Sequence, residues 1–226
     1  MRTILTFVFL LLLVAAAVPM IPLRTAVDLL HLGKFGFAAR EIDGNLWSGH
    51  LYEATFGKAS LGDVTTHMSP GDLVTGRVRL DLEGSDPISA LKGGFSFGLG
   101  GAGIDGFGLA IPAVGGAPMV PPATIIVEGV SARFPGGECA GASGAARAIV
   151  AGAGLSGPVL CREGKLTFDL ASDSGREQQQ IMMLSARSYR LRALIKATDP
   201  ALASRLRAAG FAATPEGYSY ETERTL

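Results

Sequence analysis

The segment Val74–Glu83, VTGRVRLDLE, alternates apolar and polar side chains along its length. Its apolar face has a period of two and consists of Val74, Gly76, Val78, Leu80 and Leu82. Because successive side chains of a β-strand point to opposite faces, this period predicts an antiparallel strand with one face buried and the other in water. A helix would scatter the same residues around its axis.

The alternation recurs elsewhere in the chain. Further strands are predicted at Lys165–Leu170 and Tyr189–Ala197 and, from weaker patterns, at Trp47–Phe56, Phe95–Leu99 and Ile125–Val130. The 31 glycines and the aromatic content of 7% also favour many short strands and turns over a helical bundle. We therefore predict a mainly β fold, a curved and largely antiparallel β-sheet domain with one short C-terminal helix packed on it.

That helix is predicted at Pro200–Ala209. Asp199 is a favourable N-cap, and Gly210 can adopt the left-handed conformation that ends a helix. The residues expected to pack on the sheet are Leu202, Leu206, Ala209 and Phe211. A second, short helix is predicted at Arg24–Leu32.

The N-terminal segment Thr3–Leu23 is uncharged and almost wholly apolar. At about 1.5 Å rise per residue, a helix of this length spans the ~30 Å hydrocarbon layer of a bilayer. We predict an uncleaved single-pass anchor whose main apolar residues are Ile4, Leu5, Phe7, Leu10, Leu13, Val14, Val18 and Ile21. A signal peptide cleaved near Ala15–Ala17 is the alternative, but the apolar run continues past these small residues, which favours the anchor.

The two cysteines, Cys139 and Cys161, both lie beyond this segment. An even pair of cysteines after a membrane anchor suggests a disulfide bond, and such bonds persist outside the reducing cytosol. We therefore place the domain outside the cytoplasm. The alternative to the disulfide is two buried thiols. A metal site at the cysteines is disfavoured because no histidine is close to either of them in the sequence.

Composition and charge limit the remaining choices. The net formal charge is 0 and charged residues make up 18% of the chain, so no surface for nucleic acid is predicted. We divide the chain into a cytoplasmic start with the anchor (residues 1–23), an extracytoplasmic β-rich domain (24–213) and a polar tail (214–226) that is expected to be loosely ordered. Residues 93–116 are glycine-rich and are interpreted as a turn-rich connection.

Two motif matches in the glycine-rich stretch do not support an enzyme. Gly98, Gly100 and Gly103 have the spacing of a dinucleotide-binding loop, but no helix pattern follows them to form the phosphate site. Gly94, Ser96 and Gly98 have the spacing of a nucleophile elbow, but every histidine precedes Ser96, the reverse of the order in that fold. We therefore predict no catalytic residue and no cofactor.

Other polar groups are interpreted as surface positions. The close carboxylate pairs Glu41/Asp43 and Asp169/Asp173 do not by themselves indicate a catalytic cleft. His50 and His67 could meet across strands as metal ligands, but a third ligand is not evident. A basic group is expected on the solvated side of a strand, with an acidic partner or lipid headgroups as alternative contacts; it comprises Arg187, Arg190, Arg192 and Lys196.

Several segments follow one another in a characteristic order. They are Pro22–Leu30 with His31–Gly33, Ala39–Gly44, Gly44–Gly49, Leu73–Val78, the two cysteines, Leu155–Gly157, Tyr189–Arg190 and Asp199–Phe211. The residues taken as the family signature are Gly44, Leu46, Trp47, Gly49 and Gly76. Together these segments resemble protein N of the bacterial type II secretion system over nearly all of the chain after the anchor.

This resemblance implies a single-pass inner-membrane protein with a periplasmic domain, accessory to the machine that exports folded proteins across the outer membrane. Its partners would be other components of that system, and it would act by binding, without enzymatic activity. The alternative is a lipid-binding or lipid-transfer protein similar to AsmA, because a one-faced sheet with a single helix leaves apolar surface uncovered.

Overall fold

The computed structural model describes residues 22–25, 37–45, 47–56, 59–69, 72, 76–86, 90–114, 123–150, 153–185 and 188–225. The main apolar residues of the predicted anchor, Ile4 to Ile21, all lie outside these ranges, as does most of the predicted helix Arg24–Leu32. Within the described ranges, no helix is long and apolar enough to cross a membrane.

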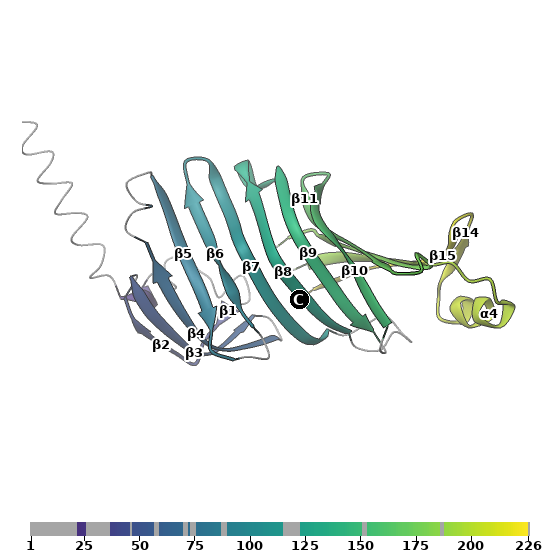
Figure 1. Cartoon of the computed structure of the whole chain (residues 1–226), viewed down its shortest axis with the longest axis horizontal. Helices are drawn as coiled ribbons and strands as arrows, with labels where there is room; N and C mark the ends of the chain where they lie inside the picture. Colours follow the sequence, from purple (N-terminus) through teal and green to yellow (C-terminus); the bar gives the residue numbers. More distant parts are fainter. Residues whose placement is uncertain are drawn as a thin grey trace, which may run out of the picture.

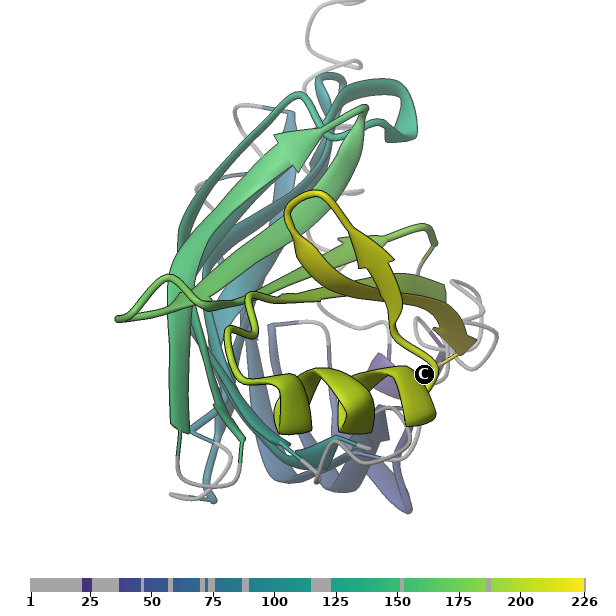
Figure 2. The same cartoon turned by 90° about the vertical axis from the view of Figure 1, so that its right-hand side faces the viewer.

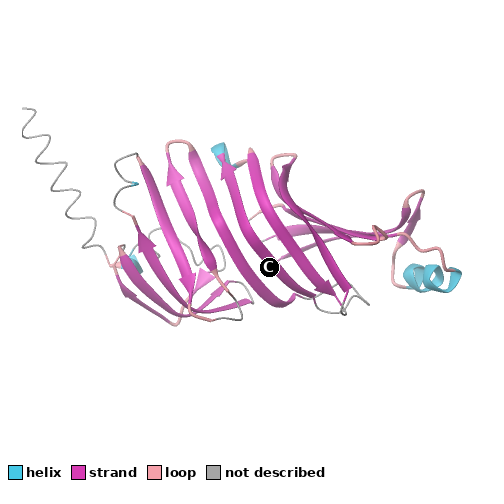
Figure 3. Cartoon of the chain, in the orientation of Figure 1, coloured by secondary structure: helices cyan, strands magenta, loops and turns pink. Residues whose placement is uncertain are grey.

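The described residues form one open antiparallel sheet of fifteen strands (Figures 1 and 3). The strands are β1 (Phe37–Ala38), β2 (Glu41–Gly44), β3 (Ser48–Phe56), β4 (Ala59–Met68), β5 (Arg77–Gly84), β6 (Lys92–Gly98), β7 (Gly101–Val114), β8 (Ala123–Phe134), β9 (Gly141–Val150), β10 (Ala153–Arg162), β11 (Lys165–Ser172), β12 (Glu177–Met183), β13 (Ser188–Ile195), β14 (Ala212–Thr214) and β15 (Gly217–Thr225). From β3 to β13, strands that follow one another in the chain are neighbours in the sheet. The predicted mainly β, antiparallel fold is confirmed.

The sheet is curved (Figure 2). Its apolar face is the concave one, because buried side chains of β4 and β7 belong to one cluster. β4 contacts β7 although β5 and β6 lie between them, so the sheet bends around the side chains of one face. Two clusters of buried apolar side chains lie on that face. The N-terminal cluster includes Leu51 and Leu109, and the C-terminal cluster includes Val130, Val159 and Leu191.

The strand predicted at Val74–Glu83 is present as β5. Its alternating side chains point to the two faces of the sheet. Val78 pairs with Phe97 and Leu80 pairs with Phe95 of β6, so apolar side chains form rows across neighbouring strands. Gly76 differs from the prediction. It lies in a turn with a φ of +72°, a conformation that glycine adopts without strain.

The sequence suggested that the glycine-rich stretch is a connection. Instead, the stretch forms most of β6 and β7. Its phenylalanines lie on the concave face and several of its glycines on the convex face. A Cβ at Gly94 would lie only 2.7 Å from Asp81 Oδ1, and one at Gly103 would overlap the guanidinium of Arg133. Glycine here lets long polar side chains lie flat on the sheet.

The C-terminal helix α4 (Pro200–Ala208) is present as predicted. The Asp199 carboxylate accepts hydrogen bonds from the backbone N–H groups of Ala201 and Leu202, at 3.0 and 3.4 Å, and Gly210 has a φ of +90°. Leu206 is buried, but Leu202 is 39% exposed, because α4 packs against β15 at one end of the sheet instead of covering its face (Figure 2).

The polar tail is ordered, which differs from the expectation for residues 214–226. β15 pairs with β13 over eight residues, from Tyr218 opposite Ile195 to Thr225 opposite Ser188. Arg190 forms ion pairs with Glu221 and Glu223 across the two strands. The tail therefore has a partner strand that composition alone did not reveal.

The two cysteines form a disulfide bond, which confirms that prediction. Cys139 follows β8 and Cys161 lies in β10, so the bond links two segments on either side of β9. Cys139 is 6% exposed and belongs to the C-terminal cluster. The bond therefore fixes the end of β8 to the core.

Candidate functional site

The described body of the protein begins at Pro22, within the last two residues of the predicted anchor segment Thr3–Leu23. Pro22 forms an isolated β-bridge with Asn45, and Leu23 is 3% exposed within the N-terminal cluster. The Leu23 side chain occupies the space that a Cβ would take at Gly49. Leu23 is thus part of the sheet's core, although the sequence suggested that it ended the membrane span.

The family-signature residues gather mainly at the turn between β2 and β3. Gly44 has a φ of +87° and pairs directly with Gly49. The Asn45 side chain accepts hydrogen bonds from the backbone N–H groups of Trp47 and Ser48, at 3.0 and 3.1 Å. These contacts form a tight turn against Leu23. Leu46 lies outside the described residues, and Gly76 lies in the separate turn before β5.

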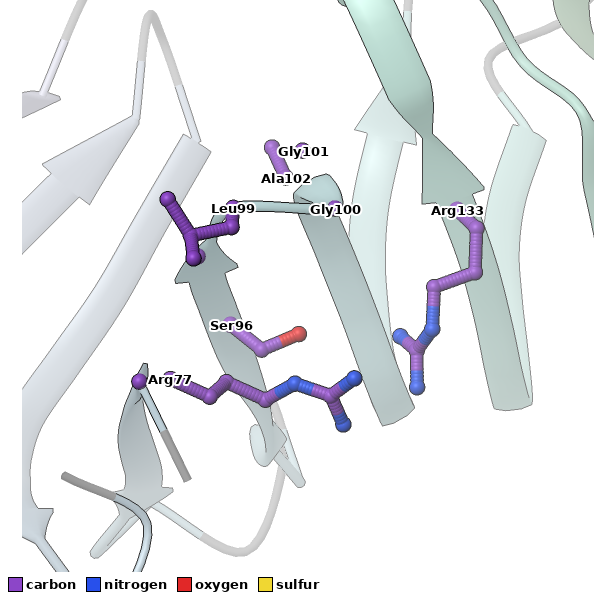
Figure 4. A pocket seen from close by; sticks show the side chains of 9 residues that line it. Arg77, Ser96, Leu99, Gly100, Gly101, Ala102 and Arg133 are labelled. Atoms are coloured by element: carbon purple, nitrogen blue, oxygen red, sulfur yellow. The ribbon is translucent and has the colours of Figure 1, made fainter. Parts of the chain in front are cut away.

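A hollow lies on the convex face, at the rim where β5 and β7 begin and β6 and β8 end (Figure 4). Its lining includes Arg77 from β5, Ser96 from β6 and Arg133 from β8. Leu99, in the turn between β6 and β7, lies at its edge. We call the turn and the adjoining ends of β5 to β8 the β6–β7 tip.

The charged groups beside the hollow are paired, with one exception. Arg133 Nη2 donates to Asp105 Oδ1 at 2.5 Å. Burial raises the pKa of Asp105, but hydrogen bonds from Arg133 and Ser96 outweigh it, so the pKa lies below its usual range. Arg77 is exposed and forms no ion pair with a carboxylate among the described residues. The hollow therefore has one positive charge in excess.

Apolar side chains are exposed at the same tip. Leu99 is 103% exposed, Phe97 is 50% exposed and Val78 is 38% exposed. Val78 and Phe97 lie on the concave face, opposite the two arginines, and Leu99 is at the end of the turn. Large exposed apolar side chains that gather in one place indicate a contact surface.

The concave face itself is a second candidate surface. Phe95, Ile104 and Phe107 are only half-buried there. Among the described elements, the one regular α-helix, α4, lies at the β15 end and leaves this face open (Figures 1 and 2). An apolar ligand could therefore reach the middle of the sheet.

The free edge of β15 is a third candidate. β14 pairs only with Gly217–Ser219, so Tyr220–Thr225 has a neighbouring strand on the β13 side alone among the described residues. At the other end of the sheet, β1 and β2 both pair with β3 and cover much of its edge. An unpaired strand edge can accept an extended segment of a partner.

The residues of the rejected enzyme motifs have ordinary structural roles. Gly98 and Gly101 pair across a turn of two residues, so no helix N-terminus follows them. Ser96 is buried beneath Asp105, as a hydrogen-bond donor to that carboxylate. His50 and His67 are both exposed on β3 and β4. No group of three or more potential metal ligands is found in the part of the chain that the structure describes.

The other polar groups named in the sequence do not line the hollow of the β6–β7 tip. Asp169 accepts hydrogen bonds from Arg162 and Gln180, and the Asp43 side chain caps the backbone N–H of Gly44. Arg192 is exposed on β13, and Arg187 lies outside the described residues. Asp169 thus links neighbouring strands, and Asp43 stabilises the turn after β2.

The hollow of the β6–β7 tip is not evident in the sequence. Arg77 and Arg133 are far apart in the sequence and come together only because β5 to β8 are consecutive antiparallel strands. The available signal was local: glycines alternate with aromatic residues in β6, and arginines alternate with apolar residues in β5.

Residues 36–220 match the family of type II secretion system (T2SS) protein N, so the chain belongs to that family. It is therefore a component of the type II secretion system. Comparisons with curated proteins and with solved structures find no match.

Proposed function

We propose that the chain is a non-enzymatic accessory component of the type II secretion system, which supports export of folded proteins across the outer membrane through protein contacts in the periplasm. The family match over residues 36–220 is the observation that carries this proposal. The N-terminal segment anchors the protein in the inner membrane by a single pass. The periplasmic domain begins at Pro22 and includes the tail, because both belong to the sheet.

Two features support the periplasmic location. A disulfide bond between Cys139 and Cys161 suits an oxidising compartment. The apolar residues 3–21 lead into the body at Pro22 with no hydrophilic linker, so an anchored body lies close to the bilayer. Tethering raises the local concentration of the body beside other inner-membrane components, so weak contacts become occupied.

The free edge of β15 is the surface that best suits a protein partner. Strand addition uses backbone hydrogen bonds, which an edge of six residues, Tyr220–Thr225, offers without side-chain pockets. A second copy of the chain is disfavoured. Symmetric antiparallel pairing of this edge over five residues places Glu221 opposite Glu223, or Glu223 opposite itself, and like charges directly opposite are destabilising.

Photo-crosslinking in cells tests the proposed contact. Benzoylphenylalanine at Arg224, on the β15 edge, should give a crosslink to another type II secretion component, identified by mass spectrometry. The matched control is Arg192, which is exposed on β13 but has a paired strand on both sides. Equal crosslinks at both positions, or none to a secretion component at Arg224, would contradict the proposed contact.

A lipid-binding or lipid-transfer role similar to that of AsmA is the second candidate, favoured by the uncovered concave face. A polar substitution of a half-buried residue, Phe95→Ser, should then reduce the lipid that co-purifies with the chain after removal of detergent. The control Leu202→Ser lies away from that face and should leave the lipid content unchanged. Absence of bound lipid in the wild-type chain would count against this candidate and leave the secretion role intact.

A further inference from the structure

The β6–β7 tip projects an apolar side chain beyond the sheet. Leu99 occupies a two-residue turn between Gly98 and Gly101, and glycine at Gly100 leaves it without a large neighbour in the turn. Of the five large apolar side chains that are exposed among the described residues, three belong to this tip. Hot-spot residues of protein interfaces are typically surrounded by neighbours that exclude water, whereas Leu99 projects from a turn.

Two arginines lie directly behind this side chain. Arg77 and Arg133 line the same hollow, with the Ser96 hydroxyl between their strands (Figure 4). Asp105 neutralises Arg133, whereas Arg77 is unpaired among the described residues. Guanidinium groups bind phosphate with two parallel N–H donors, so the hollow suits a phosphate oxygen better than an apolar group.

The tip also lies near the point where the chain enters the body. Leu23 packs on Gly49, and Gly49 is in register with Thr66 and Leu82 across β3, β4 and β5. Val78, which begins the tip on β5, is four residues from Leu82, about 13 Å along the strand. A membrane that holds the segment before Pro22 is therefore within reach of the tip.

We propose that the β6–β7 tip contacts the surface of a bilayer with anionic phospholipids. Leu99 enters the interfacial layer, and a headgroup phosphate lies in the hollow between Arg77 and Arg133. An exposed apolar residue combined with nearby cations is the arrangement that binds such a surface, and the tether makes a weak contact sufficient. The proposal rests on the anchor in the proposed function but not on the secretion role.

Fluorescence of a label at the tip tests this contact in the full chain. Leu99→Cys provides a single free thiol, because Cys139 and Cys161 are bonded, and it is labelled with NBD. The chain is reconstituted in nanodiscs of phosphatidylethanolamine and phosphatidylglycerol at about 3:1, with 5-doxyl lipid as quencher. Nanodiscs of phosphatidylcholine alone, which lack anionic headgroups, are the lipid control. Leu202→Cys, exposed on α4, is the matched control for the label.

We expect quenching at position 99 in the anionic nanodiscs and little at position 202. Arg77→Gln should lower the equilibrium constant for insertion, the ratio of inserted to free tip, about five-fold, because one basic residue near an anionic surface contributes about 1 kcal/mol and 1.4 kcal/mol is a factor of ten. Arg192→Gln, the control on β13, should have no effect.

Equal quenching at positions 99 and 202 would overturn the proposal. So would quenching at position 99 that depends neither on phosphatidylglycerol nor on Arg77. Shielding of the label only after addition of envelope proteins, without quenching by lipid, would assign the tip to a protein partner instead. A chain that does not co-purify with nanodiscs overturns the anchor and the contact together, whereas co-purification without quenching overturns the contact alone.

Discussion

Arg133 donates a hydrogen bond to Asp105 across β7 and β8, at 2.5 Å, and the Arg133 guanidinium lies over Gly103. A Cβ at Gly103 would overlap Arg133 Nη1 and would lie 2.7 Å from Ser96 Oγ. The pair is therefore possible in this geometry only over a glycine. This relationship links the glycine content of the chain to the charge of the hollow.

Gly103→Ala should displace Arg133 and lower the free energy of unfolding by about 1 kcal/mol, roughly the net value of one partly exposed hydrogen bond. Combining it with Asp105→Asn should cost less than the sum of the two single changes, because both remove the same contact. Denaturant unfolding of the full chain in detergent measures these differences. Gly154→Ala, with no atom near its Cβ position, should be neutral, and full additivity of the double variant would argue against the shared contact.

Asp105 should also contribute to the dependence of stability on pH. Its folded-state pKa is lowered, so its contribution is fully present above the unfolded value of about 3.9 and is lost as the pH falls through the folded value. The difference in unfolding free energy between wild type and Asp105→Asn should shrink as the pH is lowered from 5 to 3, by about 1 kcal/mol or less. Glu53→Gln, which removes a surface pair with Arg40, is the control and should have little effect; a difference for Asp105→Asn that stays constant with pH would refute the assignment.

The disulfide should stabilise the sheet measurably. Loss of the bond in the double variant Cys139→Ser, Cys161→Ser frees a loop with a sequence separation of 22 and should lower the unfolding free energy by about 3 kcal/mol. Reduction of the wild-type chain with dithiothreitol should give a similar loss, and it should not change the stability of the double variant. Free thiols in the untreated chain, measured with Ellman's reagent, would show that the bond is absent.

Removal of the tail should destabilise the fold. A chain that ends at Gly210 lacks Phe211, β14 and β15, which exposes the β13 edge and uncovers Leu191. We expect a loss of about 2–4 kcal/mol, from at least one large apolar side chain returned to water and the ladder removed. A chain that ends at Thr225 is the control. Unchanged thermal unfolding of the shorter chain would mean that the tail does not belong to the sheet.

The sequence was sufficient for the strands whose faces differ strongly in polarity. In β5, arginine and leucine alternate, and in β11, Leu166 and Leu170 flank charged positions, so the period of two was readable. The cap of α4 was readable because Asp199, Pro200 and Gly210 act within one short segment. Each of these signals is local in the chain.

The features that escaped prediction depend on neighbouring strands. β6 and β7 contain many glycines, which weaken the alternation, yet the phenylalanines of β6 line up with Val78 and Leu80. β15 is polar on both faces and is held by Arg190 and the β13 ladder, which a reading of residues 214–226 alone does not contain. The same reason applies to the hollow, where three strand connections bring Arg77 and Arg133 together.

The secretion role is tested most directly by the amount of exported protein outside the cells after deletion of the gene. The account predicts that exported proteins accumulate in the periplasm, that the full chain restores their release, and that a chain without residues 1–21 does not, because it lacks the anchor. Normal release in the deletion strain, with altered envelope lipids, would contradict the secretion role and favour the lipid-binding alternative.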